Sequence, residues 1–130
     1  MQLFYDTETT GNTENDRLCQ LAYKTKEETF ESLYLPPIPI SIESMSVHHI
    51  TEKMVKGKPL FKDSSDYQKI KNLFESKENI VVAHNAKFDL DIIKKENILP
   101  QRHICTLRVA RSLDKNGVIP NYRLQFLRYY

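Results

Sequence analysis

The chain has 130 residues, of which 40% are hydrophobic and 28% charged, and this balance predicts one soluble domain with a core of its own. The formal net charge of +2 is too small to identify a polyanionic partner by itself. The two cysteines form no C-x-x-C pattern and no apolar run reaches membrane-spanning length, which argues against a disulfide framework and a membrane protein and predicts a cytoplasmic location. Positive charge is concentrated in residues 101–130, a pattern that fits either a solvated face or contact with a phosphate backbone.

The first part of the chain predicts three strands in an antiparallel meander. Residues 2–8 form the first strand, and residues 17–24 and 28–35 alternate apolar and polar side chains with a period of two. In the second strand this alternation places Leu18 on one side and Cys19 and Leu21 on the other. Prolines at residues 36, 37 and 39 end the third strand, because proline cannot donate to a strand ladder.

The rest of the chain predicts helices that alternate with two more strands. A short helix is expected near residues 42–48, a helical turn capped by Thr51 follows it, and a longer helix starts from an N-cap at Asp63 or Ser64. Residues 79–83 form a wholly apolar strand of the kind found inside a sheet, and Asn85 caps a helix that runs to about residue 96. A fifth strand over 102–105 precedes helices over 106–113 and 122–130, the last of them capped by Asn121.

This order of elements predicts the α/β fold class. Three antiparallel strands followed by parallel strand–helix units form a mixed five-stranded sheet with helices on its faces. We expect the fourth strand to lie beside the first, so that Asp89, one turn into the following helix, approaches the end of the first strand.

Two carboxylates stand one residue apart where the first strand ends. Asp6 and Glu8 share one face of a strand, so their oxygens could bind a common Mg²⁺ or Mn²⁺ ion. The alternative is a strand edge with two solvated acids. The apolar residues before them favour the metal site, because paired carboxylates beside a buried strand are costly without a counter-ion. Asp89 alone would be interpreted as a first-turn acid favoured by the helix dipole.

Three motifs in order resemble the DEDD family of 3′→5′ exonucleases, in the branch similar to the epsilon proofreading subunit of bacterial DNA polymerase III. Asp6-Thr7-Glu8-Thr9-Thr10-Gly11 matches D-x-E-T-T-G, and His84 to Asp89 matches H-N-A-x-F-D. Between them, Val47 to Thr51 resembles V-H-G-I-T, with His49 where glycine is usual. Residues 105–111 and 121–124 are similar to the same branch, so the resemblance spans the whole chain.

The resemblance implies a ribonuclease H-like fold and a two-metal reaction on a phosphodiester bond at a DNA 3′ end. Asp6, Glu8 and Asp89 would be catalytic and would bind two Mg²⁺ or Mn²⁺ ions. The third motif of the family, a histidine and a last aspartate, should follow the 122–130 helix and is absent from the 130 residues. We therefore expect one exonuclease-like domain over 1–130 that lacks its C-terminal motif, binds metal weakly and has little turnover.

By the same resemblance, the terminal nucleotide would contact the turn after the first motif and the V-H-G-I segment, through the residues Thr9, Thr10, Gly11, Val47, His48 and Ile50. His48 is equally well explained as a structural histidine bound to backbone, and His84 is better explained as a residue that orients its turn. The expected partners are the 3′ end of single-stranded DNA and a DNA polymerase subunit. The alternatives are an exonuclease that trims RNA 3′ ends and a non-catalytic nucleic-acid-binding module tethered to a polymerase.

Overall fold

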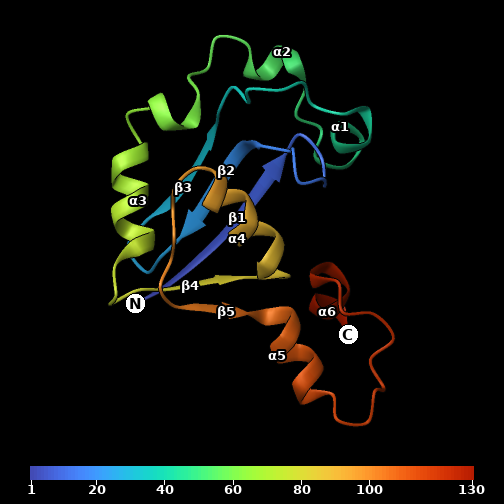
Figure 1. The fold of residues 1–130 in the computed structure, drawn as a ribbon. Coiled ribbons are helices and arrows are strands. Elements are labelled where there is room, and N and C mark those ends of the chain that lie inside the picture. The colour runs from blue at the N-terminus through green and yellow to red at the C-terminus, as the bar shows by residue number, and fades with distance from the viewer.

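A computed structural model describes all 130 residues and contains one five-stranded mixed sheet. The strand order is β3-β2-β1-β4-β5, and the figure shows the strands side by side with helices around them (Figure 1). The strands are β1 (Gln2–Thr9), β2 (Leu18–Lys24), β3 (Thr29–Leu33), β4 (Ile80–Ala83) and β5 (His103–Cys105). The predicted fold class and all five predicted strands are confirmed.

The central strand β1 joins the two halves of the sheet. It pairs antiparallel with β2, which pairs antiparallel with β3, as the predicted meander requires. On its other side β1 pairs parallel with β4, and β4 pairs parallel with β5. The prediction that strand four lies beside strand one is therefore confirmed.

A β-bulge in β2 lies next to the end of β1. Glu8 pairs with Gln20 but Thr9 pairs with Leu18, so Cys19 is the extra residue on β2. One extra residue reverses the alternation of sides along a strand. Leu18 consequently joins Leu21 in the main core, and Cys19 lies in a second cluster. The predicted alternation, which put Leu18 opposite Leu21, was wrong at this position.

The main core lies between one face of the sheet and the helices α3 (Tyr67–Glu75) and α4 (Ala86–Lys95). β1 contributes Leu3 and Tyr5 to this core, and the ring of Tyr5 contacts Phe74 of α3 edge-on at 5.2 Å between centroids. The opposite face of β1 carries Phe4 and Asp6, which are exposed. Leu3 and Tyr5 therefore pack in the core, whereas Phe4 and Asp6 point to the opposite side of the sheet.

Two short helices, α1 (Ile42–His48) and α2 (Glu52–Val55), lie close to the C-terminal end of β1 (Figure 1). The second cluster, formed by Cys19, Ile40, Ile50 and Val55, attaches this segment to the sheet. The segment is followed by a 3₁₀ turn, η1 (Phe61–Asp63). Burial of these apolar side chains is what places α1 beside the end of β1.

Helix starts differ from the sequence predictions more than helix interiors do. The N-cap of α3 is Asp66, not Asp63 or Ser64, and its carboxylate accepts a hydrogen bond from Tyr34 instead of capping the helix. Thr51 and Asn85 occupy N-cap positions, but neither side chain makes a capping hydrogen bond. Asn85 has a φ of 61°, a left-handed conformation that asparagine tolerates better than most residues.

The last two helices are α5 (Thr106–Leu113), which has its predicted bounds, and α6 (Leu124–Tyr129), which begins two residues later than predicted. Asn121 does not cap α6 but accepts a hydrogen bond from the backbone N–H of Arg123. Neither helix contains a buried residue; α5 extends away from the sheet beyond β5, and the chain then turns back so that α6 lies near the end of β4 (Figure 1). None of the helices is both long enough and apolar enough to cross a membrane.

Candidate active site

The end of β1 and the start of α4 bring the three predicted catalytic acids into one region. Asp6 and Glu8 project from the face of β1 that faces away from the main core, as their spacing predicts. Asp89 lies in the first turn of α4 and is buried. Its Oδ1 accepts hydrogen bonds from the backbone N–H of Thr7 at 3.1 Å and from the Thr7 hydroxyl at 2.6 Å. Asp89 is thus attached to the one residue that separates Asp6 from Glu8.

The pKa of each of the three acids is raised above its usual value. The pKa of Asp89 is raised to about 6, mainly because burial disfavours the charged form; the hydrogen bonds from Thr7 oppose this rise and the negative charge of Asp6 adds to it. Loss of surrounding water also raises the pKa values of Asp6 and Glu8, and the charge of Asp6 adds to the effect at Glu8. No Lys or Arg forms an ion pair with any of the three.

The three carboxylates provide the kind of ligand atoms that a divalent cation binds. Carboxylate oxygens are the ligands that Mg²⁺ and Mn²⁺ prefer, and a cation would offset the mutual repulsion of the acids. No three His, Cys, Asp or Glu side chains converge as a ready-made metal centre, however. The acids are therefore electrostatic neighbours, and their roles as ligands stay a prediction.

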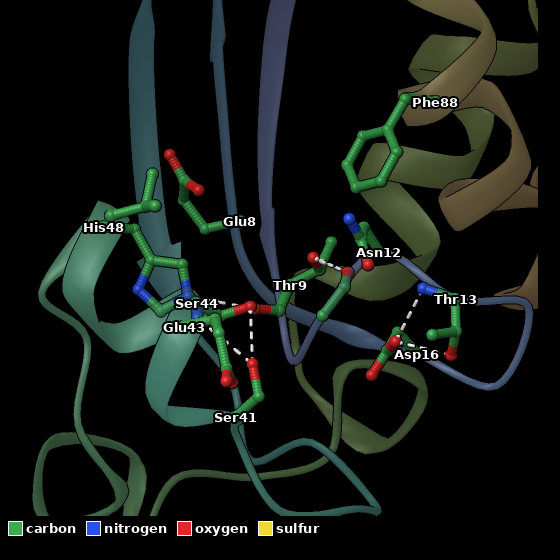
Figure 2. Close-up of a pocket in the computed structure, with 12 residues that line it drawn as sticks. Glu8, Thr9, Asn12, Thr13, Asp16, Ser41, Glu43, Ser44, His48 and Phe88 are labelled. Carbon is green, nitrogen blue, oxygen red and sulfur yellow. Dashed lines mark hydrogen bonds between the residues drawn. The ribbon is translucent and has the colours of Figure 1, made fainter.

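A pocket of about 540 Å³ opens beside Glu8, and its volume is within the range of small-ligand sites. Figure 2 shows Glu8 and His48 on one side of it, and Phe88 of α4 and Asn12 of the loop after β1 on the other. Four of the predicted substrate-binding residues line the pocket: Thr9, Gly11, Val47 and His48. The pocket is therefore lined by both of the segments in which nucleotide contacts were predicted, and the contacts themselves stay a prediction.

Thr10 and Ile50 do not line this pocket. Thr10 is fully buried, and its hydroxyl donates to Asp16 and accepts from the backbone N–H of Arg17. Ile50 belongs to the second hydrophobic cluster. The expectation that these two residues contact the substrate directly needs correction, because their side chains pack inward and support the pocket from below.

His48 combines the two interpretations that its sequence context left open. It lines the pocket, yet both ring nitrogens are occupied by backbone groups. The N–H of Ile50 donates to Nδ1 at 3.0 Å, so Nε2 carries the proton and donates to the carbonyl of Thr9 at 2.9 Å. His48 therefore connects the end of α1 to the end of β1.

Seven further residues line the pocket that sequence reasoning did not single out as site residues: Asn12, Thr13, Asp16, Ser41, Glu43, Ser44 and Phe88. Ser41 caps α1, because its hydroxyl accepts from the backbone N–H of Ser44 at 3.1 Å. Phe88 packs partly on the core and also faces the pocket. The available signal was Phe88 itself, which stands inside the H-N-A-x-F-D match.

His84, at the end of β4, reaches the C-terminal part of the chain. Its Nε2 lies 2.6 Å from the carbonyl oxygen of Tyr122, and its Nδ1 lies 2.9 Å from the hydroxyl of Thr106. The predicted role of orienting its own turn is thus too local, because the contacts join the sheet to the segment that contains α5 and α6.

The sequence of the chain is similar to those of known exonucleases and DNA polymerase III proteins. A family model described as "Exonuclease" matches residues 3–130. The chain is 29% identical to the DNA polymerase III subunit epsilon of Treponema pallidum, with 95% of this chain and 61% of that protein covered. It is 34% identical to the PolC-type DNA polymerase III of Caldanaerobacter subterraneus, with 95% of this chain and 9% of that protein covered.

One solved structure resembles the fold and retains appreciable sequence identity. Exonuclease X in complex with 5′ overhanging duplex DNA superposes with a TM-score of 0.71 and 30% identity, and the match covers 98% of this chain and 70% of that one. The chain thus spans most of that nuclease but less than two thirds of either curated polymerase relative.

Proposed function

The chain belongs to the exonuclease family whose model matches residues 3–130, and on that premise we propose that it is a metal-dependent 3′→5′ exonuclease domain acting on DNA ends. The observation that carries the proposal is the pocket in which Glu8 of β1, His48 of α1 and Phe88 of α4 meet. Such a pocket accommodates one terminal nucleotide beside the acids that would act on its phosphate.

Exonucleases of the DEDD type generally use divalent metals, and here we assign Mg²⁺ or Mn²⁺ to Asp6, Glu8 and Asp89. Bound metal would lower the pKa of an attacking water and stabilise the leaving 3′ oxygen. Asp6 and Glu8 supply oxygens from β1, and Asp89 adds negative charge from behind Thr7. Thr9, Gly11, Val47 and His48 hold the nucleotide, whereas Thr10 and Ile50 support them.

DNA is the favoured substrate because the 30% identical exonuclease X was solved with DNA bearing a 5′ overhang, which leaves a recessed 3′ end. A polymerase partner follows from relatives that are DNA polymerase III proteins, and with it a cytoplasmic location. We treat residues 1–130 as a single exonuclease-like domain.

The proposal is tested with an oligonucleotide labelled at its 5′ end. The oligonucleotide is incubated with the purified protein in Mn²⁺, Mg²⁺ or EDTA. We expect loss of nucleotides from the 3′ end in Mn²⁺ or Mg²⁺ and none in EDTA, because the metal would activate the attacking water. Asp6→Asn should reduce the rate roughly 100-fold or more, since losing a ligand removes several kcal/mol of transition-state stabilisation.

Asp91→Asn is the matched control, because Asp91 is an exposed acid on α4 paired only with Lys87. It should leave the rate unchanged. Shortening that persists in EDTA, or that starts from the 5′ end, would contradict the proposal. Binding of a 3′ end without any cleavage would favour the non-catalytic module, and preference for RNA would favour the RNA-trimming alternative.

A further inference from the structure

The loop between β1 and β2 is organised around the carboxylate of Asp16. Oδ1 accepts from the hydroxyl of Thr10 at 2.7 Å, and Oδ2 accepts from the backbone N–H and the hydroxyl of Thr13 at 2.8 and 2.7 Å. The bond from the Thr13 hydroxyl is the largest of the effects that hold the pKa of Asp16 below its usual value. Three charge-assisted hydrogen bonds on one carboxylate fix the course of a short loop.

Position 11 requires glycine because the Asp16 carboxylate leaves no room for a side chain, and not because of its backbone conformation. Its φ is not among the positive values in the chain, so an alanine could adopt the same backbone angles. A Cβ at Gly11 would lie 2.5 Å from Oδ2 and 2.6 Å from Cγ of Asp16, which is closer than atoms can approach. The glycine is required because the carboxylate fills the volume that a side chain would need.

The same loop is attached to α4. The ammonium group of Lys95 donates to the backbone carbonyl of Asp16 at 2.8 Å, and the neighbouring Arg17 forms a hydrogen-bonded ion pair with Glu96 just after the helix. The start of α4 supplies Asp89, and its first turn supplies Phe88 to the pocket. α4 therefore both holds the loop after β1 and contributes Phe88 to the pocket.

We propose that Asp16 is a positioning residue for the terminal nucleotide: it holds Gly11, Asn12 and Thr13 as the pocket wall opposite His48 (Figure 2). The inference rests on the proposed function, because it names the part of the pocket that recognises the substrate. Asp16 acts through the loop, since its two oxygens are already engaged by Thr10 and Thr13.

The experiment is an NMR titration of the full 130-residue chain with thymidine 5′-monophosphate in Mg²⁺. Asp16→Ala should weaken binding about tenfold, because the loop loses three charge-assisted bonds and must be ordered by the ligand. Gly11→Ala should weaken binding by a similar factor. The double variant Gly11→Ala with Asp16→Ala should be no weaker than Asp16→Ala alone, because removal of the carboxylate leaves room for the new methyl group.

Asp114→Ala is the matched control. Asp114 also accepts bonds from two loop N–H groups and one hydroxyl, but it lies outside the pocket. This variant should bind the nucleotide as the wild type does. Asp16→Asn retains one acceptor oxygen for Thr10 and should show an intermediate loss, which provides a second test if Asp16→Ala does not fold.

The possible failures can be told apart. Equal affinity of the wild type and the Asp16 variants would overturn the inference and leave the proposed function intact. Independent, additive losses in the double variant would overturn the coupling between Gly11 and Asp16. A wild-type chain that binds no mononucleotide at all would overturn the proposed function itself, and the inference with it.

Discussion

His49 is a residue at which local backbone strain can be measured directly. It follows α1 with φ 62° and ψ 15°, in the left-handed region where glycine is favoured, and its N–H donates to the carbonyl of Met45. A side chain in this conformation costs about 1 kcal/mol or more. His49→Gly should therefore raise the free energy of unfolding by roughly 0.5 kcal/mol, because the greater freedom of glycine in the unfolded chain offsets part of the relieved strain.

Urea unfolding followed by circular dichroism would measure the change. His49→Ala retains a Cβ and should give no comparable gain, so it separates backbone strain from loss of the imidazole. A stabilisation that is equal in both variants would show that the imidazole, and not the backbone, is the source of the strain.

At the scale of single residues, the side of the strand on which a residue lies was easier to predict than whether the residue is buried. The D-x-E spacing correctly placed Asp6 and Glu8 on one face, because alternation along a strand is a local rule. The same reasoning could not show that Thr10 is buried while Thr9 faces a pocket, since the loop that covers Thr10 is held by Asp16. Asp16 itself looked like one more turn residue, because its partners become neighbours only when the loop closes.

At the scale of helices and strands, the existence of each element was predicted better than the residue at which it begins. Apolar periodicity identified α3 and α4, but the actual N-cap residue Asp66 bonds to Tyr34, a partner distant in sequence. The bulge at Cys19 had no signal of its own, because an extra residue in a strand is defined only by its pairing with β1. Long-range contacts decide both features, and a single sequence does not contain them in local form.

The C-terminal end of α4 is held by the ion pair between Arg17 and Glu96, and the contribution of this pair to stability can be measured. Arg17 Nε and Nη2 both donate to Oε1 of Glu96, whose side chain is only 3% exposed, while that of Arg17 is 29% exposed. Glu96→Ala should destabilise the protein by about 2–3 kcal/mol, because it leaves a half-buried guanidinium without its partner. Urea unfolding of the purified variant gives this value.

Asp91→Ala on the same helix removes the pair with Lys87, whose two side chains are 58% and 84% exposed. That pair is solvated, so its loss should change the unfolding free energy by at most about 0.5 kcal/mol. Similar effects of the two substitutions would mean that the Arg17–Glu96 pair does not hold the helix to the loop.

At the scale of the whole molecule, the sheet and the C-terminal segment differ in how firmly they are held. The predicted sheet order is the observed one: the antiparallel meander places β1 at its inner edge, β4 pairs with β1, and β5 pairs with β4. The predicted helix over 106–113 is present as α5, but it has no buried residue and Leu113 is 75% exposed. Periodicity predicts an apolar stripe on a helix but does not predict what lies against it.

The C-terminal segment should consequently open on its own, without unfolding of the sheet. Neither α5 nor α6 buries a side chain, and His84 makes the hydrogen bonds that join Thr106 and Tyr122 to the end of β4. Amide hydrogen exchange measures such local opening, and the buried strands should exchange only through global unfolding. We expect amides of residues 107–130 to have protection factors at least about 100-fold lower than those of β1 and β4.

His84→Ala should lower the protection of residues 107–130 further while leaving that of β1 unchanged, because it removes the contacts to both Thr106 and Tyr122. His103→Ala is the matched control, since His103 is exposed on β5 and its ring makes no hydrogen bond. Protection of α6 that equals that of β1, or that survives His84→Ala, would show that the segment is held by its aromatic side chains. The measured ratio therefore separates a C-terminal segment attached through one histidine from a segment that is an integral part of the sheet's cooperative unit.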